Sequence, residues 1–463
     1  MLKINLSLKA ADLLPALEKF FALSAQKIRS IEKTWNPADG TPVFTVKGKY
    51  ISRGWTEWTQ GFQFGSALLQ FDASEEQQFL TEARSKIVER MAPHVSHVGV
   101  HDHGFNNIST YGNLRRLMRE GRIPDNEWEM NFYELALKLS GAVQAARWTQ
   151  LSTDLGYVYS FNGPHSLFCD TMRSMRALVL SHQLGHRLMG EKDAAINLLH
   201  RALQHAEATA RFNVYFGEGR DVYDVRGRVA HESIFNLKDG SYRCSSSQQG
   251  YSPFSTWTRG QAWIMSGFAE QLEFLRLLPE AEFLSQVEQH NIFRRFEEVA
   301  AAVCDFWLEH TPADGIPYWD TAAPNLHKLG DWAARPADPF NAHEPVDSSA
   351  AVIAAQGLLR YGNYLCATNR KRAGTRYRQA ALTIASCILQ EPYLSTNSKH
   401  QGLILHSIYH RPNGWDYIPP GQKIPCGESS LWGDYHAREL ALMILREARG
   451  LPYYTFFGPT GSL

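Results

Sequence analysis

Two aspartates stand in settings that could handle protons. Asp102 lies between two histidines in the run His-Asp-His-Gly-Phe at 101–105, and Asp170 opens the run Asp-Thr-Met at 170–172. Such a polar run beside an apolar segment costs desolvation energy unless it serves a site. Two carboxylates at one place give the pairing that glycosidases use, with one kept protonated by burial and by its neighbour's charge. An aspartate at a helix start is more commonly an N-cap, which is the alternative for both.

A second motif combines a cation with an aromatic face. Arg259 and Trp263 are four residues apart, so they share one side of a helix. Arginine can bind a carboxylate through two hydrogen bonds, and tryptophan offers a flat face to a sugar ring. A cation–π pair within the core is the alternative. The chain's 12 Trp, 19 Tyr and 24 Phe suit sugar binding, or simply a large core.

Metal and cofactor motifs are weak. His182 and His186, like His406 and His410, have the i, i+4 spacing of metal ligands, but neither pair has an evident third ligand. Neither a glycine-rich phosphate loop nor a nucleophile elbow is found. We therefore expect no cofactor and no catalytic metal.

The elements that must position these residues are helices. Apolar residues recur at three- and four-residue spacing in six amphipathic segments, and a more apolar set alternates with them. The amphipathic segments cover 10–33, 76–92, 126–148, 190–210, 289–310 and 371–390, and the apolar helices start near 59, 105, 170, 257, 347 and 429. This alternation predicts an all-α double ring of about twelve helices.

The starts of the apolar set carry most of the polar motifs. Each includes a Ser, Thr or Asp able to cap a helix, and all six would face one end of the ring. Strand alternation is short, near 43–51 and 156–161. The irregular segments 213–255, 311–346 and 393–428 are expected to be loops or hairpins over this mouth. No linker divides the chain, which favours one domain over 1–463.

Composition narrows the partners and the compartment. Lys+Arg and Asp+Glu are equal at 47 each, which argues against a nucleic-acid or membrane-surface partner. The six cysteines have no C-x-x-C pair and are expected to be free, buried thiols. The first residues include no run typical of a signal peptide, so we expect a cytoplasmic protein, or a periplasmic one if a signal was removed. The oligomeric state stays open.

Taken in order, six motifs resemble a known family. They are W-T-x-G-F, H-D-x-G-F, D-T-M, R-G-Q-A-W, D-S-S-A and W-G-D-Y, and they run from about Trp55 to Leu445. The set resembles the unsaturated glucuronyl hydrolases, glycoside hydrolase family 88. The resemblance implies an (α/α)6 barrel and a substrate that is an oligosaccharide ending in a 4,5-unsaturated uronic acid. The enzyme would hydrate the vinyl ether: a proton goes to C4, water adds at C5, and the hemiketal opens to release the remaining sugar.

The resemblance also implies roles for eight residues. Asp170 corresponds to the proton donor and water activator, and Asp102 to its partner carboxylate. The implied substrate-binding residues are Arg259, Trp263, His231, Gln249, His101 and Trp58. A proton donor must be protonated in the working complex, so we expect the pKa of Asp170 to lie above its ordinary value.

Four other functions remain as alternatives. A polysaccharide lyase on the same toroid would create the double bond rather than consume it. An unsaturated rhamnogalacturonyl hydrolase of family 105 would share the barrel and the chemistry. A sugar 2-epimerase would use paired histidine bases, for which His231, His406 and His410 are candidates. A sugar-binding protein without activity would leave both aspartates as helix caps.

Overall fold

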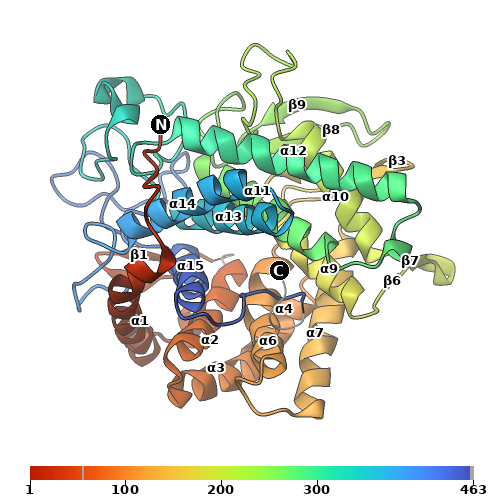
Figure 1. Cartoon of the computed structure of the whole chain (residues 1–463), viewed down its shortest axis with the longest axis horizontal. Coiled ribbons are helices and arrows are strands. Elements are labelled where there is room, and N and C mark those ends of the chain that lie inside the picture. The colour runs from red at the N-terminus through yellow and green to blue at the C-terminus, as the bar shows by residue number, and fades with distance from the viewer. Residues whose placement is uncertain (55–56, 459–463) are drawn as a thin grey trace.

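The protein is a double ring of helices, described here from a computed structural model (Figure 1). The structure describes residues 1–54 and 57–458; Trp55, where the family resemblance begins, lies outside them. A continuous core of buried apolar residues extends from Leu2 to Phe457. No helix of the described residues combines the length and apolarity that a membrane span requires.

Six apolar segments form the inner ring. They are α2 (Gln60–Ser74), α5 (His103–Asn107) with a π-helical turn (Ile108–Gly112) and α6 (Asn113–Arg119), α8 (Thr171–Ser174) with α9 (Arg176–Gln183), α11 (Thr258–Leu275), α13 (Ser348–Ala367) and α15 (Leu431–Ala448). Each of these segments contacts the next one in the order α2, α5, α8, α11, α13 and α15, and α15 contacts α2, so the ring is closed. Every residue of α11 is buried, as expected for a helix with neighbours on all sides.

Six amphipathic helices pack outside this ring. They are α1 (Leu14–Thr34), α3 (Gln77–Arg90), α7 (Glu127–Ala146), α10 (Leu198–Phe212), α12 (Gln286–His310) and α14 (Lys371–Ile388). Each contacts the inner helix beside it in sequence, and α1 also contacts α15, so the first outer helix lies beside the last inner helix (Figure 1). This is the (α/α)6 barrel that the sequence predicts.

Short elements lie between the helices. The strands are β1 (Phe44–Val46), β2 (Lys49–Ile51), β3 (Trp148–Ser152), β4 (Leu155–Val158), β5 (Ser166–Phe168), β6 (Leu188–Met189), β7 (Ala195–Ile196), β8 (Glu232–Phe235) and β9 (Tyr242–Ser246). The short helices are α4 (Ala92–Val95) and the 3-10 turns Ala10–Leu13, Pro37–Asp39, Glu57–Thr59, Glu191–Asp193, Glu280–Glu282, Leu326–Leu329 and Trp332–Ala334. All strand pairs are antiparallel, and β5, β8 and β9 form the one sheet of three strands in the described chain.

Three expectations need correction. The helix predicted over 190–210 begins at Leu198, because β6 and β7 form a hairpin over 188–196. Side-chain capping occurs at Asp347 and Ser430, but Asp102 and Asp170 make no capping hydrogen bond. The cysteines are free as expected, but Cys244 is exposed and two others are only half-buried.

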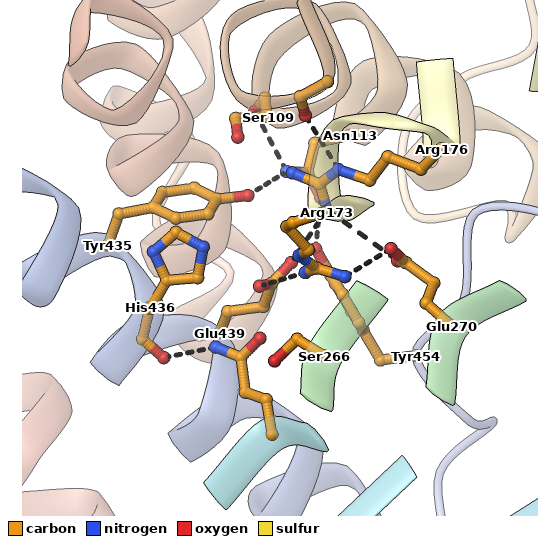
Figure 2. Close-up of polar contacts among 12 residues, drawn as sticks. Ser109, Asn113, Arg173, Arg176, Ser266, Glu270, Tyr435, His436, Glu439 and Tyr454 are labelled. Carbon is orange, nitrogen blue, oxygen red and sulfur yellow. Dashed lines mark hydrogen bonds and ion pairs between the residues drawn. The ribbon is translucent and has the colours of Figure 1, made fainter. Parts of the chain in front are cut away.

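An ionic cluster fills the middle of the inner ring (Figure 2). Arg173 of α8 donates to Glu270 of α11 and, over 3.3 Å, to Glu439 of α15, and all three side chains are almost fully buried. Arg176 of α9 has Nη1 3.8 Å from a Glu270 oxygen. Burial raises the pKa of Glu439, but Arg173 and Arg176 outweigh burial and hold that pKa at about 2. Helices from three distant parts of the chain therefore share buried charge at the axis of the barrel.

Candidate active site

A cavity of about 350 Å³ opens at the end of the barrel where the inner helices begin. Aromatic rings form a large part of its wall, since seven of its eighteen lining residues are Phe, Trp or Tyr. The lining residues are Glu57, Trp58, His97, Gly99, Val100, His101, Asp102, Phe105, Phe161, Asp170, Gln248, Gln249, Trp257, Arg259, Trp263, Tyr409, His410 and Trp415. Of the eight residues expected in the site, seven line this cavity.

The two aspartates occupy equivalent places in adjacent inner helices. Asp102 directly precedes α5, and Asp170 directly precedes α8. Asp170 follows β5, whose neighbour Cys169 donates its N–H to the carbonyl of His231 over 2.9 Å. Each aspartate is only 8% exposed. Because neither side chain caps its helix, the capping alternative does not explain these two carboxylates.

His101 lies between the two carboxylates. Its Nε2 atom is 3.8 Å from Oδ1 of Asp102 and 3.8 Å from Oδ2 of Asp170. The imidazole stacks on Phe161 and meets the edge of Phe168. Neither ring nitrogen of His101, nor Oδ1 of Asp170, has a hydrogen-bond partner among the described residues. Buried polar atoms usually have partners, so these three unpartnered atoms mark the group as a candidate functional site.

The charges in this group affect one another. Burial lowers the pKa of His101, but Asp102 and Asp170 outweigh it and raise that pKa above its ordinary value. Burial raises the pKa of Asp102, and the charge of Asp170 adds to this effect. Burial also raises the pKa of Asp170, but His101 and His231 outweigh it, so the net change is downward. The expected upward shift in the pKa of Asp170 is therefore absent from the substrate-free protein, because His101 and His231 favour the ionised carboxylate.

Arg259 is at the cavity, but its guanidinium already has protein partners. Nη1 donates to Asp347 over 3.0 Å and to the carbonyl of Ile408. Nη2 donates to Gln249 over 3.0 Å and to the carbonyl of Tyr409 over 2.7 Å. All four Nη hydrogens are thus used. In this state Arg259 holds the 408–409 segment and Gln249 in place, and a substrate carboxylate reaching Nη2 would have to displace Gln249.

His231 is the one expected residue that does not line the cavity. It is buried behind Phe168 and Trp257, with ring centroids 4.5 and 4.9 Å away. Its Nδ1 atom accepts the N–H groups of Gln248 and Gln249 over 3.0 and 3.3 Å. This arrangement fixes the Gln248–Gln249 turn against the cavity, and it leaves Nε2 as the nitrogen that carries the proton.

Two tryptophans of the cavity wall both contact Phe105. Trp58 stacks on Trp432, with centroids 5.2 Å apart, and Trp263 lies 4.8 Å from Phe105. Both line the cavity, and their role in substrate binding stays a prediction. Sequence reasoning did not single out Tyr409, whose segment 393–428 has no regular element from which to infer its position.

The three irregular segments do not contribute equally. Segment 213–255 supplies Gln248 and Gln249, and segment 393–428 supplies Tyr409, His410 and Trp415. No described residue of 311–346 lines the cavity, contrary to the expectation for that segment. Of the histidines proposed for an epimerase, only His410 lines it, so those three histidines do not converge there. The described residues include no group of three or more His, Cys, Asp or Glu able to hold a metal ion.

Comparison with known proteins finds relatives with the same fold and bears on the family resemblance. The chain is 25% identical over 418 residues to the unsaturated glucuronyl hydrolase of Bacillus sp. (strain GL1), covering 88% of this chain and 90% of that protein. A crystal structure of an unsaturated glucuronyl hydrolase specific for heparin has a TM-score of 0.69 at 19% identity, covering 94% of this chain and 98% of that one. The resemblance to the unsaturated glucuronyl hydrolases is confirmed.

A third likeness includes a bound sugar. It is a mutant of the unsaturated glucuronyl hydrolase from Streptococcus agalactiae, complexed with dGlcA-GalNAc6S. Its TM-score is 0.61 at 18% identity, covering 92% of this chain and 90% of that one. No family model matches the chain. The likeness to these unsaturated glucuronyl hydrolase structures establishes the fold, and the residues in the cavity must support the function.

Proposed function

We propose that this protein is a glycoside hydrolase that releases a 4,5-unsaturated uronic acid from the non-reducing end of an oligosaccharide by hydrating its vinyl ether. The observation that supports this best is the buried group of Asp102, His101 and Asp170, which has unpartnered polar atoms and lines the cavity. Two carboxylates with a shared proton can deliver that proton to carbon and then accept one from water. The named relatives, which share this fold, support the same reaction.

The proton can be followed through the proposed reaction. Asp170, protonated in the complex, gives its proton to C4 of the double bond. A water molecule adds its oxygen to C5 and returns a proton to Asp170. The hemiketal opens by breaking the bond between C5 and the ring oxygen: C5 becomes a ketone, and the hydroxyl proton passes to the ring oxygen, which leaves a hemiacetal at C1. The hemiacetal then collapses to an aldehyde, as the bond from C1 to the departing sugar oxygen breaks and that oxygen takes the proton. One water is consumed for each sugar released.

Binding of the substrate supplies the protonation that the free protein lacks. A uronate carboxylate brings a negative charge into a site from which it excludes water, and both effects raise the pKa of a nearby carboxyl group. Asp102 and His101 are within reach as the source of the proton. The upward shift of the pKa of Asp170 would then arise in the complex.

The test is a spectrophotometric assay with one matched control. The purified protein is mixed with unsaturated disaccharides from chondroitin, hyaluronan, heparin and pectin digests, and the near-ultraviolet absorbance of the conjugated double bond is followed. We expect loss of absorbance with the wild type, and none with Asp170→Asn. Asp314→Asn changes an equally buried aspartate outside the cavity and should keep the activity.

The outcomes separate the alternatives. Fastest loss on the pectin product would favour the rhamnogalacturonyl hydrolase of family 105. Flat traces on every disaccharide would contradict the proposal, and interconversion of epimers without release of an unsaturated uronate would favour the epimerase. Full activity of a folded Asp170→Asn variant would contradict the role assigned to Asp170.

A further inference from the structure

Asp102 and Asp170 precede separate helices, and buried side chains connect the main chain next to Asp102 with the helix that follows Asp170. At the point of contact Gly104 of α5 faces Ser174 of α8: a Cβ atom added to Gly104 would stand 2.5 Å from the Cα of Ser174 and 2.6 Å from its carbonyl oxygen. Any other residue at 104 would push α5 away from α8. The spacing of Asp102 and Asp170 therefore depends on this contact.

Two side chains complete the connection. Ser174 Oγ accepts the N–H of Gly104 over 2.8 Å and donates to Oε1 of Gln144 over 3.2 Å. Gln144, on the outer helix α7, donates from Nε2 to the carbonyl of His101 over 2.8 Å. The main-chain groups on both sides of Asp102 are thereby tied to the helix that begins after Asp170. Gln144 and Ser174 are 0% exposed, and neither lines the cavity.

Arg176 anchors the same contact to the ionic cluster. Its Nε atom donates to the carbonyl of Gly104 over 2.7 Å. The rest of its guanidinium lies near Glu270 and Glu439, as Figure 2 shows for the cluster at the axis. Both main-chain groups of Gly104 are thus satisfied by side chains of α8 and α9. Because all these groups are buried, losing one leaves a partner without a hydrogen bond.

We propose that Gln144 and Ser174 are positioning residues, which set the distance between the Asp102 and Asp170 carboxylates around His101 without touching the substrate. For the reaction this inference rests on the proposed function. The spacing of the two carboxylates is the same whatever the substrate is, and the pKa of His101 is sensitive to that spacing. Small errors of placement lower catalysis strongly, since a displacement of about 1 Å can cost about a hundredfold in rate.

The main experiment compares two buried serines. Ser174→Ala removes the hydroxyl that joins Gly104 to Gln144. Ser181→Ala is the control: Ser181 is equally buried on α9 and donates to the carbonyl of Lys138 on the same outer helix α7, but has no connection to either aspartate. Each variant is assayed well below its melting temperature, for kcat, KM and the pH profile of kcat/KM.

The expected result is a loss in kcat rather than in binding. Ser174→Ala should lower kcat by about tenfold or more, with KM changed by less than about threefold, and should move a limb of the pH profile. Ser181→Ala should leave all three near the wild type. An unchanged kcat and pH profile for Ser174→Ala would contradict the proposal even if its melting temperature falls, because that is what a purely structural role predicts.

A second variant and a second measurement cover the remaining cases. Gln144→Met keeps the length of the side chain and removes both hydrogen bonds, so it should reproduce the Ser174→Ala effect. The double variant should cost less than the sum of the two, because both belong to one chain of contacts. If the wild type hydrolyses none of the disaccharides, the proposed function fails, and the pKa of His101 measured by NMR still tests the positioning. That pKa should change in Ser174→Ala and not in Ser181→Ala; no change in either contradicts it.

Discussion

The pKa of His101 measures how strongly the two neighbouring carboxylates stabilise its positive charge. Asp102 is the largest of the influences that raise the pKa of His101 against its burial. Asp102→Asn removes that charge with little change of shape. At 3.8 Å and an effective dielectric constant of about 20, one such pair is worth about 4 kcal/mol, which corresponds to an upper limit of about three pH units.

The direction of the change in the pKa of His101 follows from the groups that remain around it. Without the charge of Asp102, burial still lowers the pKa of His101, and Asp170 is the remaining group that opposes burial. We therefore expect the pKa of His101 to fall by at least about one pH unit in Asp102→Asn. Between the wild-type pKa and this lower one, the histidine is protonated in the wild type and neutral in Asp102→Asn, so in that pH range Asp170 loses the cation that keeps its own pKa low.

NMR of protein labelled with ¹³C-histidine provides the assay. Several buried histidines do not interfere, because burial lowers the pKa of His94 and His103 to about 4 and that of His205 and His436 to about 3. These stay neutral above about pH 5.5.

The control is Asp314→Asn, in which the curve of His101 should match the wild type. A pKa of His101 that is unchanged or raised in Asp102→Asn would refute the electrostatic account of the site.

Two further changes test other parts of the cavity. Asp347→Asn leaves the guanidinium of Arg259, which is 3% exposed, without its charged partner and should destabilise the protein by about 3 kcal/mol. The control is Glu18→Gln, in an exposed pair with Arg449, which should cost less than about 0.5 kcal/mol of stability. The midpoints of urea unfolding measure both changes. Glu57 lines the cavity together with one arginine and no lysine among the described residues, so an unsulfated disaccharide should turn over faster than its 6-O-sulfated counterpart. Glu57→Gln should reduce the ratio of these two turnover rates by about fivefold. The same ratio in the wild type and the variant would contradict this prediction.

The barrel could be predicted from the sequence because helical periodicity is local. The starts expected near 257 and 347 are found at Thr258 and Ser348. The inner helix expected near 105 is less regular, since a π-helical turn interrupts it over 108–112. Periodicity does not reveal that turn, because its residues are all buried and show no alternation of polar and apolar faces.

The cavity residues were predictable where motifs begin helices, and less so in loops. Asp102, Asp170 and Trp263 were found through their helix starts. The partners of Arg259 were not, because two of them are main-chain carbonyls, of Ile408 and Tyr409, which have no signature in the sequence. The order of the carboxylate pKa values was also out of reach, since it depends on the position of His101 between them.

The ionic cluster at the axis has a consequence for how the chain folds. Its charges come from α8, α9, α11 and α15, and Arg360 of α13 adds a contact to Glu273 over 2.6 Å. A ring that lacked its last helix would leave Arg173 without Glu439 in an apolar interior, which is strongly unfavourable. Partly assembled rings are therefore less stable than both the unfolded and the completely folded protein. The cluster makes closure of the barrel a cooperative step that waits for the C-terminal helix.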